Sequence, residues 1–498
     1  MAPDMNPSPF PSVRPVAAAF LIAFVAGCQG AGPADRTHEW VGTLPRRDTG
    51  FDRRTWQDTS AGTVRQLIER LPDRIDSAAE HRLARNLLIS ITDAPQGDDG
   101  GGAVLALRVE ALMRIGNAGD AAALARAGRS PPRDEAGARR EAEAELLAGN
   151  VEMGCIDLRA LAARSSSRWV EAGVALCRVR AGEPGAAVPS GIDRLGALAR
   201  IAGAPLPAEP APDDPPGTLI AYRAAVGGDP KVPAPRRLEA AFAAARASAL
   251  SGEAYARILH SARSQGTLAE GPPATGEQAA ALFRAIEGTG DPARKLALAE
   301  RGLLSPDGTV DGVGAAMAEA LHGVRPVAGP LAARFAAYFY AVGDVKAAAP
   351  WSDLAKRSGA DTGAWPYRAL VKPPGAAELA QWGKRAHLDP ARRERIAAIL
   401  TAFGVWEAGS PDPAQEQLQA IDRAAAQQHV GETTLLALTI LGSGGPAGAS
   451  PQALRHVLAA LDRVNLHDEA RAIAWEAMAA TLVPHTASRK GEVAASDS

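Results

Sequence analysis

The chain has few of the residues that build β-sheets or carry chemistry. Aromatic residues make up 4% of its 498 positions, and only seven of its 54 basic residues are lysine. Runs in which Val, Ile, Tyr or Phe alternate with polar residues are scarce, although β-strands favour such runs. Ala and Leu fill most apolar positions instead. The composition therefore argues against a β-rich fold and favours a chain that is nearly all helix.

Excess charge of either sign is also missing. The chain carries 54 basic and 56 acidic residues, a net charge of −2. Removing residues 1–27 takes away one base, Arg14, and one acid, Asp4, so the remainder stays at −2. We therefore expect no nucleic-acid partner and no basic patch for anionic lipid.

Sequence motifs for catalysis and metal binding are absent. The nine histidines are scattered, with His456 and His467 the closest pair, and neither His-x-x-x-His nor Cys-x-x-Cys spacing occurs. Gly-x-Ser-x-Gly and the phosphate-binding Walker loop are missing too. The sequence thus predicts no catalytic residue, no metal ligand and no cofactor, and a protein that is not an enzyme. A site assembled from scattered acids, unreadable from sequence, is the least favoured alternative.

The N-terminus has the pattern of an export signal. Arg14 precedes an apolar run, residues 16–27, that is too short to span a bilayer as a mature helix. The run ends in Val25-Ala26-Gly27-Cys28, which resembles a bacterial lipobox, so residues 1–28 are predicted to be a lipoprotein signal ending in a lipidated Cys28. The resemblance implies that Gln29 directs the protein to the outer membrane. The alternative is an ordinary cleaved signal or a short membrane anchor with an unmodified Cys28, and with cleavage a soluble periplasmic protein.

The remaining two cysteines are placed to pair. Residues 165–167, three serines, read as the turn of a helical hairpin, and Cys155 and Cys177 each lie eleven residues from Ser166. Equal distances put both thiols at the same height on antiparallel helices, where a disulfide fits. Two buried free thiols are the alternative.

Helix signals recur along the rest of the chain. Ser77-Ala78-Ala79-Glu80 is a capping box, and later helices begin with a cap residue and Pro, as at Asp291-Pro292, Asp389-Pro390 and Ser450-Pro451. A phrase of Gly, a small polar residue and an Ala-rich start, as at Gly116 and Gly343, resembles the turn between helices of tetratricopeptide repeats. We expect an all-α fold, a right-handed TPR-like α-solenoid of irregular helical hairpins; a non-repetitive helical bundle is the alternative.

Composition changes divide the chain into segments. Residues 203–217 hold six prolines and predict a linker between two helical parts. The predicted organisation is listed in order: residues 1–28, signal; residues 29–59, flexible tether; residues 60–202, helical-hairpin domain; residues 203–217, Pro-rich linker; residues 218–484, helical-repeat domain; residues 485–498, disordered tail.

One concentration of aromatic residues suggests a binding surface. Ten of the 22 aromatics fall between Phe335 and Trp406. Rings along a groove would stack on sugars or anchor a peptide, whereas the simpler interpretation is that they fill the core. Trp365 and Trp382 are the two rings most expected to be exposed.

The pattern as a whole resembles secreted, Ala-rich helical-repeat proteins of Gram-negative, alphaproteobacterial type, sometimes labelled "antifreeze glycopeptide polyprotein". The resemblance includes the Leu-Ala-Gly before Cys155 and Ala181-Gly182 after Cys177. An ice-binding function would need Ala-Ala-Thr repeats, and the chain has one such triplet, at residues 479–481. The expected function is a non-catalytic scaffold, lipid-anchored at the periplasmic face of the outer membrane, that binds partner proteins of the cell envelope through its helical surface. The alternative is a peptidoglycan-associated accessory module.

Overall fold

The structure, a computed structural model, is all-helical over the residues that it describes. These are residues 41–97, 102–128, 135–183, 215–230, 232–262, 266–268, 270–360, 363–374, 378, 381–382, 388–406 and 416–483. They form 23 helices and no β-strand, with three isolated β-bridges between extended segments. The prediction of an all-α fold is confirmed.

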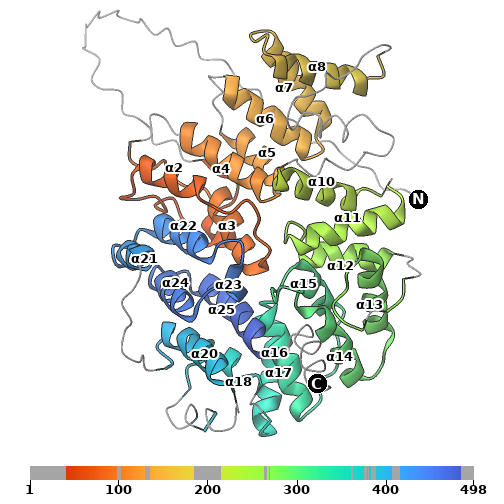
Figure 1. Ribbon diagram of the computed structural model, residues 1–498, viewed down its shortest axis with the longest axis vertical. Coiled ribbons are helices and arrows are strands. Elements are labelled where there is room, and N and C mark those ends of the chain that lie inside the picture. Colours follow the sequence, from red (N-terminus) through yellow and green to blue (C-terminus); the bar gives the residue numbers. More distant parts are fainter. Residues whose placement is uncertain are drawn as a thin grey trace, which may run out of the picture. The chain divides into compact units, whose positions relative to one another are not determined.

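Figure 1 shows how the helices are arranged, coloured in their order along the chain. The first eight are α1 (Arg46–Thr49), α2 (Ala61–Glu69), α3 (Ala78–Ile89), α4 (Gly102–Arg114), α5 (Ala118–Ala127), α6 (Glu135–Leu147), α7 (Val151–Ala162) and α8 (Arg168–Arg180). The next nine are α10 (Pro216–Gly228), α11 (Ala234–Arg246), α12 (Gly252–Ser261), α13 (Gly276–Gly288), α14 (Pro292–Leu303), α15 (Gly312–Glu319), α16 (Pro330–Ala341), α17 (Val345–Arg357) and α18 (Trp365–Ala369). The last six are α20 (Pro390–Ala402), α21 (Glu416–Ala426), α22 (Val430–Leu441), α23 (Gly445–Gly448), α24 (Pro451–Arg463) and α25 (His467–Leu482).

Most helix starts follow from the local sequence. Asp291, Asp389 and Ser450 each cap a helix whose first residue is proline, and each side chain accepts a hydrogen bond from a backbone N–H of the first turn. Such a bond satisfies one of the donors that a helix leaves unpaired at its N-terminus. Cap residues and prolines therefore place the starts of α14, α20 and α24 without help from tertiary contacts.

The predicted turns between helices do not all use glycine. Gly116 and Gly343 have φ values of 89° and 81°, the left-handed conformation that ends a helix and that other residues adopt at a cost. Asn465, with φ 65°, takes this place between α24 and α25. The turn phrase thus predicts where hairpins turn, although the residue that adopts the left-handed conformation varies.

The predicted boundary between two helical parts is wrong for the described residues. The described residues from Val41 onward form one compact unit, and one apolar core extends from Phe51 to Ala479. Helix α10 begins inside the predicted linker and packs on the end of α4. A Cβ atom on Gly217 would lie 2.2 Å from the Arg114 carbonyl oxygen, so only glycine permits this approach. Most of the linker, residues 203–214, and the tail, residues 485–498, lie outside the described residues.

Helices from the two ends of the described chain also pack together. In Figure 1, α22 and α25 (blue) lie beside α2 and α3 (orange), and residues of α22 contact both α2 and α3 while α25 contacts α3. These contacts bring together residues that lie about 340 to 400 positions apart in the chain. The two predicted helical domains therefore share a core rather than folding as separate bodies.

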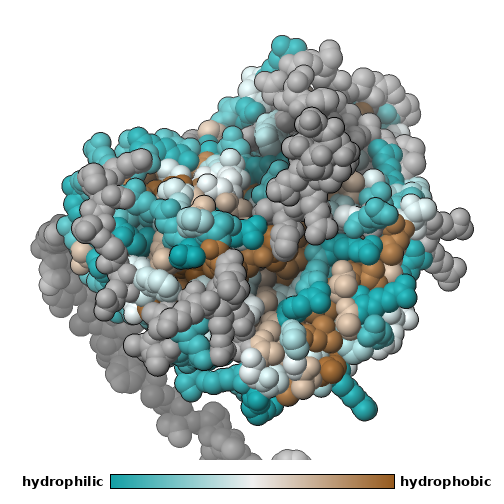
Figure 2. Space-filling view, turned by 60° about the horizontal axis from the view of Figure 1, so that its bottom comes forward, coloured by the Kyte–Doolittle hydropathy of each residue, from teal (hydrophilic) through white to brown (hydrophobic). Residues whose placement is uncertain are grey.

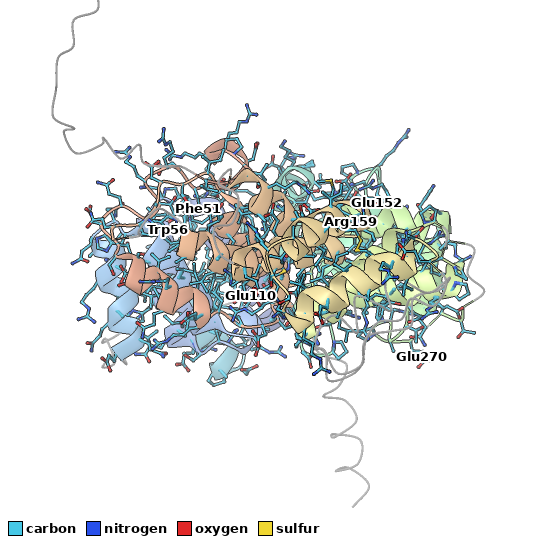
Figure 3. All side chains as sticks on the ribbon, turned by 90° about the horizontal axis from the view of Figure 1, so that it is seen from above. Phe51, Trp56, Glu110, Glu152, Arg159 and Glu270 are labelled. Atoms are coloured by element: carbon cyan, nitrogen blue, oxygen red, sulfur yellow. A yellow bond between two sulfur atoms is a disulfide. The ribbon has the colours of Figure 1, made fainter. Side chains whose placement is uncertain are left out.

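The end of the predicted tether is also folded. Residues 41–59 contribute Phe51 and Trp56 to the core, with exposed fractions of 0% and 2% (Figure 3). The Trp56 Nε1–H donates to Thr92 Oγ1 at 3.1 Å, and Val41 pairs with Thr92 in a short antiparallel bridge. Individual hydrogen bonds and two large buried rings hold this segment in place, rather than the apolar face of a helix. The segment therefore shows no apolar periodicity in its sequence.

No helix in the described part of the chain is long and apolar enough to cross a membrane. Figure 2 shows one face of the molecule, on which polar residues cover most of the surface and apolar ones gather in the hollows between them.

Candidate binding site

The predicted lipidation site, Cys28, lies outside the described residues. The predicted cysteine pair lies within them: Cys155 on α7 and Cys177 on α8 form a disulfide, with an S–S distance of 2.04 Å and Cα atoms 5.7 Å apart. Ser167 is the N-cap residue of α8, at the end of the predicted serine turn. The disulfide joins the two helices of one hairpin, as the equal spacing from the turn predicts.

The predicted exposure of Trp365 and Trp382 is wrong. Their exposed fractions are 3% and 5%, and the two rings stack with centroids 4.8 Å apart. The Trp365 Nε1–H donates to Glu378 Oε1 at 3.0 Å, which satisfies its one polar group away from water. Burial of both rings removes apolar area from water while the indole N–H keeps a partner, so neither ring offers a stacking surface.

The rest of the aromatic concentration is largely core. Phe335 stacks on Trp351 with centroids 4.0 Å apart, and Tyr340 lies against Tyr367 and Trp475. Phe403 and Trp406 are partly buried against the same core. The rings fill space that Ala-rich helices leave between them, which is the simpler of the two interpretations of the cluster.

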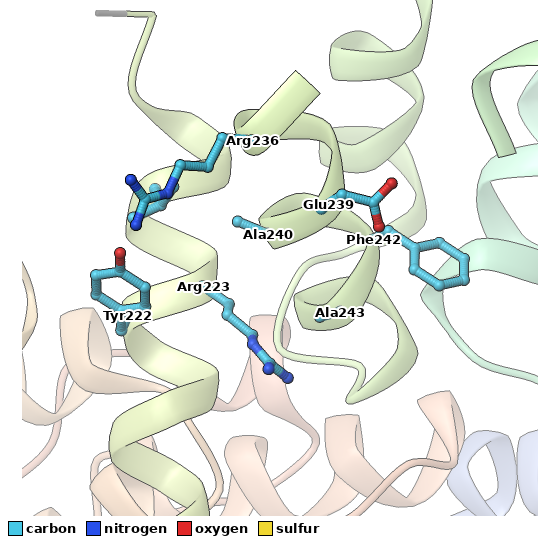
Figure 4. Close-up of a pocket in the computed structure, with 8 residues that line it drawn as sticks. Tyr222, Arg223, Arg236, Glu239, Ala240, Phe242 and Ala243 are labelled. Carbon is cyan, nitrogen blue, oxygen red and sulfur yellow. The ribbon is translucent and has the colours of Figure 1, made fainter. Parts of the chain in front are cut away.

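A cavity of about 220 Å³ lies between α10 and α11 (Figure 4). Gly227 of α10 approaches Ala241 of α11 so closely that an added Cβ would lie 2.8 Å from the Ala241 Cα, and this contact brings the hairpin together. The lining residues are Tyr222, Arg223 and Val226 from α10 and Arg236, Glu239, Ala240, Phe242 and Ala243 from α11. We call this cavity the α10–α11 cleft.

The cleft joins an apolar floor to polar walls. Tyr222 and Val226 belong to a small apolar cluster of their own with Val232, separate from the main core. In Figure 4 the Arg236 side chain reaches from α11 toward Tyr222, while Glu239 and Phe242 lie toward the opposite side of α11. Two arginines and one glutamate line the cleft, so its lining carries one more positive than negative charge. Arginine and tyrosine are also the residues most enriched at binding hot spots.

Titratable groups gather at a second place, where α25 meets the start of α3. Glu476 is buried and accepts hydrogen bonds from Ser77 Oγ at 2.5 Å and from Ala79 N at 2.6 Å. Glu80 is fully buried beside it, and its two carboxyl oxygens have no hydrogen-bond partner. The predicted capping box is therefore half formed: Ser77 Oγ accepts from Glu80 N, but the Glu80 carboxyl does not complete the box, and Glu476 bonds the helix terminus instead.

Burial dominates the electrostatics of this acid pair. Desolvation, followed by the neighbouring carboxylate of Glu476, raises the pKa of Glu80 well above its usual value. Desolvation raises the pKa of Glu476 to about 7, against the lowering effect of its bonds to Ser77 and Ala79. No group of three or more possible metal-ligating side chains occurs among the described residues. The pair joins two helices, and we assign it a structural role.

Sequence reasoning did not find the cleft. Tyr222, Arg223 and Arg236 flank a Gly- and Pro-containing stretch, residues 227–235, which the sequence marks only as a break. Antiparallel pairing of the flanking helices is what places these side chains together. The available signal was the pair of Arg residues on either side of one tight turn, a pattern too common to be informative alone.

No protein-family model, no curated protein and no solved structure matches the chain.

Proposed function

We propose that this protein is a non-catalytic scaffold of the bacterial cell envelope that binds a partner protein in the α10–α11 cleft. The observation that carries the proposal is the cleft itself, a cavity of about 220 Å³ in which two arginines and a tyrosine line an apolar floor. Its chemistry fits an acidic side chain, or a chain-terminal carboxylate, of an extended protein segment. Neighbouring apolar side chains of that segment would pack on Val226, which also lines the cleft.

Localisation forms part of the proposal. The lipobox-like Val25-Ala26-Gly27-Cys28 supports export and lipid anchoring, and Gln29 supports the periplasmic face of the outer membrane. The disulfide between Cys155 and Cys177 agrees with this, because disulfides persist in oxidising compartments. A soluble periplasmic form is the alternative if Cys28 is not acylated.

The arrangement of the helical hairpins is also part of the proposal. Antiparallel helix pairs such as α6–α7, α10–α11 and α16–α17 support the proposal of a right-handed TPR-like arrangement of hairpins. A scaffold built in this way presents many helix faces to partners. The peptidoglycan-associated role depended on exposed rings, and burial of Trp365 and Trp382 leaves it without that support.

Site-specific photocrosslinking tests the proposal. A photoreactive phenylalanine analogue replaces Ala243, a half-buried residue of the cleft, in cells that express the full chain. The matched control places the same analogue at Ala254, a half-buried alanine on α12 outside the cleft. We expect a reproducible crosslink to one envelope protein from position 243 and none from position 254.

A pair of double variants then tests the chemistry of the cleft. Arg223→Ala with Arg236→Ala should abolish the crosslink, whereas Arg257→Ala with Arg294→Ala, two exposed arginines elsewhere, should preserve it. Loss of the crosslink in both double variants, or its survival in both, contradicts binding through the cleft. A product in the cytosol with an unmodified Cys28 contradicts the proposed location.

A further inference from the structure

Helix α7 has an apolar face that points to solvent. Of the five large apolar side chains that are exposed in the described part of the chain, only Met153 and Ile156 share a helix, with exposed fractions of 44% and 54%. They lie three positions apart and so lie side by side on one face. Ala160, one turn further along, is exposed on the same face. These three residues form what we call the α7 stripe.

The hairpin holds this face outward. Cys155, Leu158 and Leu161 are buried on the opposite side of α7, and the disulfide from Cys155 ties that side to α8. Because α7 packs on α6 and α8 through its buried side, a rotation that hid the stripe would expose Leu158 and break the disulfide geometry. The stripe is therefore a fixed feature of the hairpin.

Two opposite charges flank the stripe. Glu152 and Arg159 are exposed, and both are labelled in Figure 3. They lie seven positions apart, which is two helical turns or about 10 Å of rise along the helix axis, so they share one flank of α7. Read from the N-terminus, the flank carries a negative and then a positive charge. On an identical helix that runs in the opposite direction, the positive charge therefore lies opposite the negative charge of the first helix.

We propose that the α7 stripe is an interface for a second copy of this chain, in which two α7 helices pack antiparallel about a two-fold axis near Ile156. In this arrangement Glu152 of one copy lies at the height of Arg159 of the other, and each pair occurs twice. Parallel packing about a two-fold axis would instead place the two charged flanks on opposite sides of the interface, where Glu152 and Arg159 could not pair. A strongly acidic or basic partner is not favoured, because the flank carries one charge of each sign.

The size of the interface predicts a weak, reversible dimer. A helix of 12 residues is about 18 Å long, and two such helices bury much less than the roughly 1,600 Å² of a standard interface. We expect a dissociation constant in the micromolar range, roughly 1 to 100 µM. The stripe and the α10–α11 cleft lie on different hairpins, so failure of either proposal leaves the other untouched.

Sedimentation velocity of the full chain with its disulfide intact tests self-association, over concentrations of about 1 to 100 µM. We expect a sedimentation coefficient that rises with concentration. Ile156→Asp should weaken the association at least roughly tenfold. Val371→Asp, at another exposed apolar residue, is the matched control and should leave the association unchanged. A chain that stays monomeric throughout, or equal effects of the two substitutions, overturns the proposal.

Charge exchange tests the antiparallel register. Glu152→Arg alone places two arginines at each contact, and Arg159→Glu alone places two glutamates there, so each should weaken self-association. An equal mixture of the two variants pairs arginine with glutamate at both contacts and should restore association, as should the double variant with itself. A mixture no better than either variant alone overturns the proposal, and thermal melts of both variants verify that they fold.

Discussion

At the residue scale, the buried acids at the start of α3 carry the largest electrostatic consequence. Glu476 is buried against Ser77, Ala79 and Glu80, and its pKa is raised to about 7 by desolvation. In the unfolded chain the same carboxyl titrates near its usual value of 4.5. Between these two pH values the folded state binds more protons than the unfolded state, so the free energy of unfolding falls as pH rises through this window.

We therefore predict that Glu476→Gln stabilises the protein at pH 8 and changes its stability little at pH 4, where the native carboxyl is protonated in both states. This rise in the pKa of Glu476 corresponds to a change on the order of 3 kcal/mol in the free energy of unfolding. Thermal unfolding followed by circular dichroism from pH 4 to pH 8 measures the effect. Glu416→Gln, at an exposed glutamate of α21, is the control and should leave the profile of the native protein unchanged. A Glu476→Gln profile parallel to the native one contradicts the prediction.

The two misplaced tryptophans show the limit of sequence reasoning at this scale. Trp365 lies beside Pro366 near Gly363, a setting typical of an exposed turn, and yet it is buried. Its burial depends on Trp382 and on the Glu378 carboxylate, which accepts its N–H. These two partners lie 13 and 17 positions after Trp365 in the chain. Tertiary packing brings them to it, and no local sequence pattern predicts the contact.

At the element scale, cysteine spacing from the serine turn was sufficient to predict the pairing of α7 with α8. In a helical hairpin, two residues equally far from the turn lie at the same height on the two antiparallel helices. The pairing can therefore be predicted from the local sequence. The segment 41–59 is the opposite case, because its order depends on bonds to residues 89–96 and on contact with Gly431. A segment without periodicity gives no local sign of such contacts.

We predict that Cys155→Ser with Cys177→Ser loosens the α7–α8 hairpin. In the chain-entropy model, opening a loop of 22 residues lowers the free energy of unfolding by about 3 kcal/mol, because the unfolded chain gains conformations that the disulfide excluded. Hydrogen exchange should show lost protection in α7 and α8. Cys28→Ser, which leaves the pair intact, should retain the protection, and equal protection in both variants contradicts the prediction.

At the scale of the whole described unit, the shared core couples the ends of the chain. Ile473 of α25 is fully buried, and α25 contacts both α3 and α16. Ile473→Ala leaves a cavity that costs about 2–5 kcal/mol. Because α3 packs on α25, we predict faster hydrogen exchange in α3, nearly 400 residues earlier, as well as in α25.

Leu158→Ala supplies the matched control, since Leu158 is equally buried but lies on α7, which packs on α6 and α8. Its effect should fall on those helices and spare α3. If Ile473→Ala changes exchange only in α24 and α25, the two ends of the chain do not share one cooperative core.

The sequence by itself determined the helical class, many helix starts, the hairpin turns and the disulfide, because caps, prolines, left-handed turn residues and equal spacings act over a few residues. Tertiary structure alone decided that the predicted domains share a core, that Trp365 and Trp382 are buried, and that Tyr222, Arg223 and Arg236 line one cleft. These outcomes depend on which helix faces meet, and a chain rich in alanine gives many faces of similar apolar character. Steric fit at close contacts such as Gly217 on Arg114 and Gly227 on Ala241 then selects among them, and that fit exists only in three dimensions.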